Sequence, residues 1–248
     1  MIDKETLLKI AKLNNMKPWQ QEKHYIQSVI LTCLAEKPLV FKGGTYLWFF
    51  HNLPRFSEDL DFTLIGDLKE NLAEKVSESL ILFGIENEFK LIKNDEITLS
   101  FRIAAKGPLH TSEKDLCFVY VEISKREEII EKTKVEKLDF PAYKLPIKIM
   151  QGMALDEICA EKIRAIVTRE KARDLYDLWF LIENKNVSFK KELVNNKLGF
   201  YSKKFNKKEF IEALQQKKKY FSKELDALVF GEVPKTETCV KKVLNWLD

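Results

Sequence analysis

The chain has 248 residues, of which 45% are hydrophobic and 32% charged, so it can form one large domain or two closely packed ones. No apolar run approaches the roughly 18 residues that a membrane span requires, and the N-terminus lacks a signal-peptide core, so we expect a cytoplasmic protein with no membrane partner. The formal net charge is +4, and the four cysteines and three histidines are scattered, which disfavours a disulfide framework or a zinc site.

The N-terminal segment has the periodicity of helices. Apolar residues recur with helical spacing in residues 3–15 and 18–36, and the second stripe is the clearer of the two. The short apolar run at 39–41 then indicates a buried strand. We therefore expect two scaffold helices, followed by a strand over residues 39–42.

The segment after this strand combines two glycines with a hydroxyl group, in the order Lys42-Gly43-Gly44-Thr45. Glycines at this point allow the backbone to turn sharply and to expose N–H groups to an anion, because no Cβ stands in the way. The apolar and aromatic residues that follow predict a short helix over 45–51. The segment is thus a candidate phosphate-binding turn.

Two carboxylates follow in Asp59-Leu60-Asp61, which thirteen residues separate from Thr45, within a strand predicted over 58–65. Residues i and i+2 of a strand point the same way, so both carboxylates share one face while Leu60 packs behind them. Two adjacent carboxylates repel each other, and a hard divalent cation such as Mg²⁺ relieves that repulsion. Mn²⁺ would serve the same role.

The next segment predicts a helix over 68–83 and three strands over 88–92, 97–103 and 116–123. Since helices and strands do not alternate as βαβ repeats, the fold class is α+β, with a mixed sheet and flanking helices. Glu122 lies in the most apolar of these strands. A charged residue there either faces solvent on an edge strand or has a counter-charge.

The C-terminal half is predicted to be mainly helical after a possible strand at 147–151. We expect a soft boundary near residue 150, giving a core domain over 1–150 and a basic helical lobe over 151–248. Lys162 lies inside the apolar stripe of a helix over 155–168, so its ammonium either snorkels outward or enters a polar site. Asp174 begins a helix over 173–183, where it either caps free N–H groups or holds Lys162.

Two motifs together resemble a known family. Phe-Lys-Gly-Gly-Thr from Phe41 and Arg-Phe-Ser-x-Asp-Leu-Asp-Phe from Arg55 are similar to the AbiEii/AbiGii toxins, which include the MenT toxins and have the nucleotidyltransferase fold of the DNA polymerase β type. Glu161-Lys162-x-x-Ala165, followed by Arg173-Asp174-Leu-Tyr-Asp-Leu, resembles the second signature of that family. The resemblance is close over roughly 20–65 and 155–183.

The resemblance implies an NTP-dependent nucleotidyltransferase that acts as the toxin of a toxin–antitoxin or abortive-infection system. The implied catalytic residues are Asp59, Asp61, Lys162 and Asp174. The implied metal ligands are Asp59, Asp61 and, as the third carboxylate on a later strand, Glu122. The implied nucleotide-binding residues are Lys42, Gly43, Gly44, Thr45, Arg55, Ser57, Lys162 and Arg173, although Arg55 could instead brace its loop by pairing with Glu58.

Residues 185–223, the basic tail, carry 12 lysines and 3 acids, a local net charge of +9. Its interleaved lysines and aromatics fit either a solvated helix face over a buried aromatic seam or a surface that binds RNA phosphates and unpaired bases. By family analogy the expected partners are an NTP, tRNA or another RNA, and a cognate antitoxin. Two alternatives stay open: a small-molecule, antibiotic-type nucleotidyltransferase with an acidic acceptor pocket, and a non-catalytic RNA- or partner-binding module.

Overall fold

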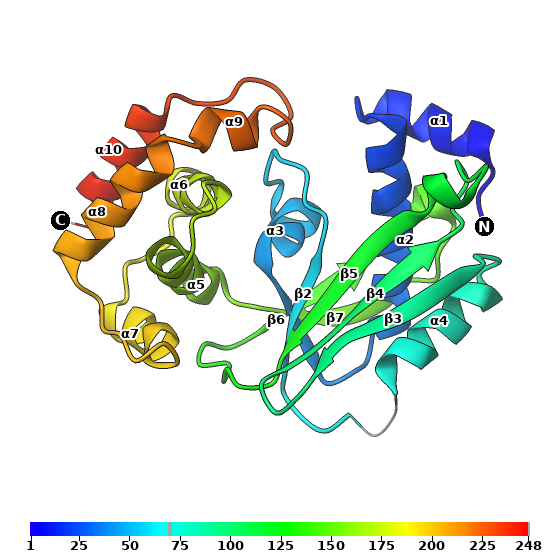
Figure 1. The fold of residues 1–248 in the computed structure, drawn as a ribbon, viewed down its shortest axis with the longest axis horizontal. Helices are drawn as coiled ribbons and strands as arrows, with labels where there is room; N and C mark the ends of the chain where they lie inside the picture. Colours follow the sequence, from blue (N-terminus) through cyan, green and yellow to red (C-terminus); the bar gives the residue numbers. More distant parts are fainter. Residues whose placement is uncertain (69–70, 248) are drawn as a thin grey trace. The chain divides into compact units, whose positions relative to one another are not determined.

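The computed structural model describes residues 1–68 and 71–247, which form a mixed sheet with flanking helices and a separate set of helices (Figure 1). The chain divides into two compact units. The first comprises Met1–Tyr46, Glu58–Glu128 and Lys134–Gly152. The second comprises Leu47–Ser57, Ile129–Thr133 and Met153–Asp248. The α+β prediction is confirmed.

The first unit contains a seven-stranded sheet with the order β3-β4-β5-β2-β1-β7-β6. The strands are β1 (Leu39–Lys42), β2 (Leu60–Leu64), β3 (Asn87–Asn94), β4 (Thr98–Ala105), β5 (Cys117–Ser124), β6 (Lys134–Leu138) and β7 (Lys148–Gly152). The pairs β2–β5 and β1–β7 are parallel and the other neighbours antiparallel. This mixed order brings β1, β2 and β5 together in the middle of the sheet, although β2 and β5 lie far apart in the sequence.

Helices of the first unit cover one face of this sheet. The helices on this face are α2 (Pro18–Leu34) and α4 (Leu72–Leu82), while α1 (Lys4–Leu13) packs against α2 and α3 (Gly43–His51) begins directly after β1. α2 contacts β5 and α4 contacts β3, and both run along the same side of these strands (Figure 1). The covered face is apolar. Alternate β5 residues, Val119, Val121 and Ile123, project from it and are fully buried.

Helices make up most of the second unit. They are α5 (Leu155–Thr168), α6 (Arg173–Lys185), α7 (Lys191–Gly199), α8 (Lys207–Lys218), α9 (Phe221–Leu225) and α10 (Thr236–Trp246). α5 contacts α6, α7 and α8, and α10 contacts α6 and α8, so α5 and α6 are central to the unit. Asn206 caps α8 by accepting hydrogen bonds from the N–H groups of Lys208 and Glu209.

Most element boundaries differ little from those predicted, with two exceptions. The predicted helix over 68–83 is observed as α4, and its residues 69 and 70 lie outside the described part of the chain. β6 was not predicted, because Lys134-Val-Glu-Lys-Leu is mostly polar and exposed, as suits an edge strand. Among residues 1–68 and 71–247, no helix combines the length and apolarity needed to cross a membrane.

Candidate active site

The diglycine turn lies against one of the predicted carboxylates. β1 is buried throughout and ends at Lys42, and α3 begins at once with Gly43, whose φ of +78° is one that residues with a Cβ rarely adopt. A Cβ on Gly43 would lie only 2.4 Å from Oδ2 of Asp61. The Thr45 hydroxyl donates a hydrogen bond to the carbonyl oxygen of Asp59. The turn and both aspartates are therefore packed together within the first unit.

Three charged residues share one row across the sheet. Lys42 on β1 is the register partner of Asp61 on β2, and Asp61 is in turn the register partner of Glu122 on β5. Register partners project to the same face, so these side chains are neighbours. Leu60 and Phe62 are fully buried on the opposite side of β2, as the alternation predicted. Glu122 is exposed at the surface of the sheet.

Further contacts fix this row and the loop that leads to it. Lys42 is buried and its Nζ lies 2.6 Å from Oε2 of Glu127. On α2, Lys23 pairs with Glu58 at 2.8 Å, while Gln27 donates to the Glu58 carbonyl at 2.9 Å. The alternative in which Arg55 pairs with Glu58 is therefore wrong, because Lys23 on α2 holds that carboxylate.

The carboxylates have the chemistry that a hard divalent cation requires. Asp61 and Glu122 are side by side by register, and Asp59 lies just before β2, two residues from Asp61. In their present side-chain positions, the described residues include no group of three acidic, histidine or cysteine side chains that could hold a metal ion.

A buried charge cluster occupies the second unit, between α5, α6 and the segment that contains Arg55. Lys162 Nζ lies 3.1 Å from Oδ1 of Asp174 and 2.6 Å from Oδ2 of Asp177. Arg55 binds Asp177 through two hydrogen bonds of 2.6 and 2.7 Å. Arg169 binds Asp174 in the same two-pronged way, at 2.7 and 2.8 Å. The cluster thus contains three cations and two anions, although the Arg169 side chain is 47% exposed.

The charge states of the cluster follow from these pairs. Burial by itself would raise the pKa of Asp177, but the Arg55 guanidinium and the Lys162 ammonium outweigh it and lower that pKa. The pKa of Asp174 is likewise lowered despite burial, by Lys162 and Arg169. Both aspartates are therefore ionised at neutral pH, and the cluster carries one net positive charge.

The structure also decides between the two predicted roles of Asp174. The residue before α6 is Ala172, which makes no side-chain cap, and the Asp174 carboxylate accepts from Lys162 and Arg169 instead. The helix-cap alternative is wrong for Asp174. Arg55 is only 1% exposed and its remaining guanidinium contact is with the Phe56 carbonyl, so in this conformation it braces the cluster.

Arg173 and Ser57 are two further predicted nucleotide-binding residues. Arg173, at the start of α6, has its Nε 3.9 Å from Oε1 of Glu224, a loose and partly exposed ion pair. Ser57 is partly exposed, just before the segment that carries Asp59. The contact of Arg173 with Glu224 does not assign it to phosphate.

The basic tail is less available to a ligand than its charge suggests. Lys197 is fully buried against Glu157 at 2.6 Å, and buried Lys217 donates to the Arg169 carbonyl. Most of the tail's aromatics face inward. Phe189, Phe205 and Phe210 contact one another with ring centroids 5.1 to 5.7 Å apart, and Phe210 and Phe221 are fully buried. The buried aromatic seam is thus observed, while Phe200 and Tyr220 remain exposed.

Sequence reasoning missed Glu127 and Arg169, and it placed Asp177 in the second family signature without assigning it a partner. Glu127 is 85 residues from Lys42, and no periodicity connects the two. Asp177 had one available signal, because it lies three residues after Asp174 and therefore on the same helix face. Arg169 lies in a short basic connector before α6. The charge of this connector does not indicate which residue Arg169 contacts.

Comparison with known proteins gives a consistent result. The profile of the family described as nucleotidyl transferase AbiEii toxin, type IV TA system, matches residues 29–242. MenT4, a nucleotidyltransferase toxin from Mycobacterium tuberculosis H37Rv, is similar in structure, with a TM-score of 0.61, 20% identity, and coverage of 99% of this chain and 88% of that one. JHP933 from Helicobacter pylori has a TM-score of 0.59, 23% identity, and coverage of 92% and 90%. No curated protein gives a significant match.

Proposed function

Because the chain belongs to the nucleotidyl transferase AbiEii toxin family, we propose that this nucleotidyltransferase toxin transfers a nucleoside monophosphate from an NTP to a hydroxyl of RNA. The 3′ end of tRNA is the acceptor that the family resemblance favours. In this reaction the acceptor oxygen forms a bond to the α-phosphorus, the α–β phosphoanhydride bond breaks, and pyrophosphate leaves. The hydroxyl proton passes to solvent or to a site carboxylate.

One observation carries the proposal: the diglycine turn and the row of carboxylates meet at Gly43 and Asp61. Glycine is required there both by its positive φ and by the 2.4 Å that would separate a Cβ from the Asp61 carboxylate. A purely structural turn does not need to approach an acidic side chain so closely. A site that brings polyphosphate next to carboxylates does need this approach, and Glu122 extends the row of carboxylates on the neighbouring strand.

The first turn of α3 supplies the groups for phosphate binding. Its initial N–H groups have no partner within the helix, and the positive end of the helix dipole lies there. Because the Thr45 hydroxyl is engaged with the Asp59 carbonyl, we assign phosphate contacts to the backbone of Gly43, Gly44 and Thr45. Lys42 is next to Asp61 in register, and its ammonium is held by Glu127.

Asp59, Asp61 and Glu122 are the residues that would hold Mg²⁺ or Mn²⁺. A divalent cation bound to them would neutralise phosphate charge and lower the pKa of the acceptor hydroxyl. The carboxylates would fix the position of the cation. The fully buried Leu60 and Phe62 keep β2 rigid behind them. The backbone placement fits this role, as described above.

Lys162 is proposed to stabilise the charge that builds on the transferring phosphoryl group. Support comes from the net positive charge of its cluster, since two buried aspartates are outnumbered by three cations. Asp174 then acts as a positioning residue for Lys162. Arg55 is given a bracing role, while Ser57 and Arg173 stay predictions from the resemblance.

The proposal is tested with total RNA and each α-labelled NTP in turn, in the presence of Mg²⁺. We expect label to reach RNA from a restricted set of NTPs, and Asp61→Asn to abolish transfer. Asp67→Asn is the matched control, since Asp67 is exposed beyond the end of β2. Turnover that survives Asp61→Asn, or no turnover with any RNA, would contradict the proposal, and RNA binding without any turnover would favour the non-catalytic module.

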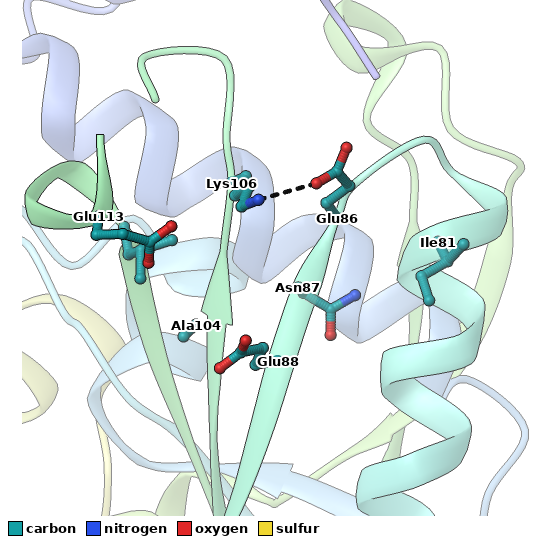
Figure 2. Close-up of a pocket in the computed structure, with 8 residues that line it drawn as sticks. Ile81, Glu86, Asn87, Glu88, Ala104, Lys106 and Glu113 are labelled. Carbon is teal, nitrogen blue, oxygen red and sulfur yellow. Dashed lines mark hydrogen bonds and ion pairs between the residues drawn. The ribbon is translucent and has the colours of Figure 1, made fainter. Parts of the chain in front are cut away.

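A small-molecule acceptor is the second candidate, because the first unit does contain an acidic pocket. This acidic pocket has a volume of about 320 Å³, and Glu86, Glu88 and Glu113 lie around it with Lys106, which pairs with Glu86 (Figure 2). However, its Ala104 is in register with Phe118, four residues from Glu122 and so roughly 13 Å along β5. A hydroxyl bound in the pocket would be too far from the carboxylates to react. RNA is therefore the better-supported acceptor.

A further inference from the structure

The first unit has an exposed face of its sheet beside the proposed catalytic carboxylates. On β5 the side chains that alternate with the buried core residues include Phe118 and Tyr120, which are 36% and 45% exposed. Tyr120 lies two residues before Glu122 and therefore projects to the same face. Two large aromatics are therefore exposed next to each other on the same face of β5 as Glu122.

Cations accompany these aromatics on the neighbouring strands. Arg102 on β4 is in register with Tyr120, and its guanidinium lies over the Phe118 ring, 4.6 Å from the centroid. Its Nε is buried and has no hydrogen-bond partner among the described residues. Lys90 on β3 is in register with Arg102, is exposed, and has no ion-pair partner within the described part of the chain. We call Phe118, Tyr120, Arg102 and Lys90 the aromatic face.

The aromatic face is continuous with the row of carboxylates. The register row Lys90–Arg102–Tyr120 lies next to the row that contains Glu122 and Asp61. Two residues along a strand separate the rows by about 6.6 Å. A base stacked on Tyr120 would thus belong to a nucleotide that neighbours the one at the carboxylates.

The acidic pocket limits how far a polyanion can extend in the opposite direction. Glu88 continues the aromatic face beyond Lys90 on β3, and Figure 2 shows Glu86 and Glu113 near it around the pocket. Three carboxylates there repel phosphate, whereas Lys90 and Arg102 attract it. The charge pattern favours a short nucleic-acid footprint that ends near Phe118.

We propose that the aromatic face docks the unpaired 3′-terminal nucleotides of the RNA acceptor. Successive bases stack on Tyr120 and Phe118, and Lys90 and Arg102 contact the phosphates between them, so that the terminal hydroxyl is delivered to the carboxylates. Aromatic stacking with cationic backbone contacts is the general means by which proteins hold single strands. This inference rests on the proposed function and assigns its acceptor-binding surface.

The test uses a fluorescein-labelled RNA hairpin with a short unpaired 3′ end, and the same hairpin with a blunt end, in Mg²⁺ without NTP. Binding is measured by fluorescence anisotropy for wild type, Tyr120→Ala, Phe118→Ala and Tyr120→Phe. Phe200→Ala is the matched control, because Phe200 is similarly exposed at 42% but lies in the basic tail. Thermal melting of each variant confirms that it is folded.

We expect each alanine variant to bind the overhanging hairpin between about 5-fold and 150-fold more weakly, the range for losing one stacked base. Tyr120→Phe and Phe200→Ala should bind like wild type, and the blunt hairpin should respond to none of the changes. Equal binding by wild type and the two alanine variants would overturn the inference. So would a result in which those variants bind RNA normally but escape the cognate antitoxin, since the face would then be a protein interface.

Label transfer to total RNA is measured in parallel, so that the two proposals fail separately. Transfer by wild type together with unchanged RNA binding in the alanine variants overturns the aromatic face alone. Absence of transfer to any RNA by wild type overturns the proposed function and, with it, this inference. A raised KM for RNA with an unchanged KM for NTP in Tyr120→Ala supports both.

Discussion

Asp61 on β2 and Glu122 on β5 are register partners in the parallel part of the sheet, although 61 residues separate them in the chain. Their side chains project to the same face, and Lys42 lies on the other side of Asp61. A third carboxylate in this position can complete an oxygen-donor set for a divalent cation, which an exposed acid on an edge strand could not do. β5 is an interior strand, between β4 and β2.

Glu122→Gln is therefore expected to lower kcat by about 10²- to 10³-fold, the loss that follows removal of one preorganised electrostatic group. Stability should change little because Glu122 is exposed. The measurement is label transfer over a Mg²⁺ titration, with Glu88→Gln on the same face as the control. A variant with wild-type kcat at every Mg²⁺ concentration would show that Glu122 is only a solvated acid.

Gly43→Ala is expected to damage both stability and activity. The left-handed conformation costs a residue with a Cβ about 1–2 kcal/mol, and the new methyl group would displace the Asp61 carboxylate. Urea unfolding and label transfer are measured together. Gly199→Ala is the control, because nothing lies within 4 Å of its Cβ position and alanine suits a helix better than glycine. Full activity in Gly43→Ala would mean that the close approach to Asp61 has no function.

The central part of the site could be predicted from the sequence because its signals are local. Alternation placed Asp61 opposite the buried Leu60 and Phe62, and the diglycine marked the end of β1, but β2 begins at Leu60, so Asp59 precedes the observed strand. The position of Glu122 next to Asp61 could not be read in this way. It depends on β5 adding to β2 in parallel, a pairing between distant segments that leaves no periodic trace in either strand.

Ion pairs were the least predictable feature. Arg55 and Asp177 are 122 residues apart in the sequence, and Lys42 and Glu127 are 85 residues apart. Tertiary packing alone therefore determines which charged residues form ion pairs. The basic tail also shows that a sequence does not reveal which charges are paired and buried. Its lysine count was read correctly, but burial of Lys197 against Glu157 removes that charge from the surface, and the count alone does not reveal this.

The Arg55–Asp177 pair gives a stability prediction. Asp177→Asn leaves the fully buried Arg55 guanidinium without its counter-charge. We therefore expect the free energy of unfolding to fall by about 3–5 kcal/mol. Arg55→Lys should also destabilise, because an ammonium cannot make the two parallel hydrogen bonds. Urea unfolding at pH 7 measures both. The control is Glu78→Gln, which breaks an exposed pair with Lys75 and should cost less than about 1 kcal/mol.

A double variant separates pairing from packing at this position. Replacing both partners, as Arg55→Met with Asp177→Leu, removes this buried ion pair and should recover part of the stability lost in Asp177→Asn. Recovery is not expected to be complete, because Lys162 also loses a partner at 2.6 Å. Equal stability of wild type and Asp177→Asn would contradict a desolvated Arg55.

His24 predicts a pH dependence of stability in the first unit. Its Nδ1 lies 2.6 Å from the Tyr143 hydroxyl, and its ring contacts those of Phe140 and Tyr143. Burial lowers the pKa of His24 to about 4 from an ordinary 6.5. Between those values the unfolded chain binds the proton and the folded chain does not, so stability is full above pH 6.5 and falls as the pH drops toward 4.

The loss over that window is expected to reach about 3 kcal/mol, since each unit of pKa corresponds to about 1.4 kcal/mol. The free energy of unfolding is measured in urea from pH 7 to pH 4 for wild type and His24→Gln. The variant should be less stable at pH 7, because it loses the ring contacts, but its stability should decline less steeply on acidification. Parallel pH profiles for the two proteins would show that His24 titrates normally in the folded state.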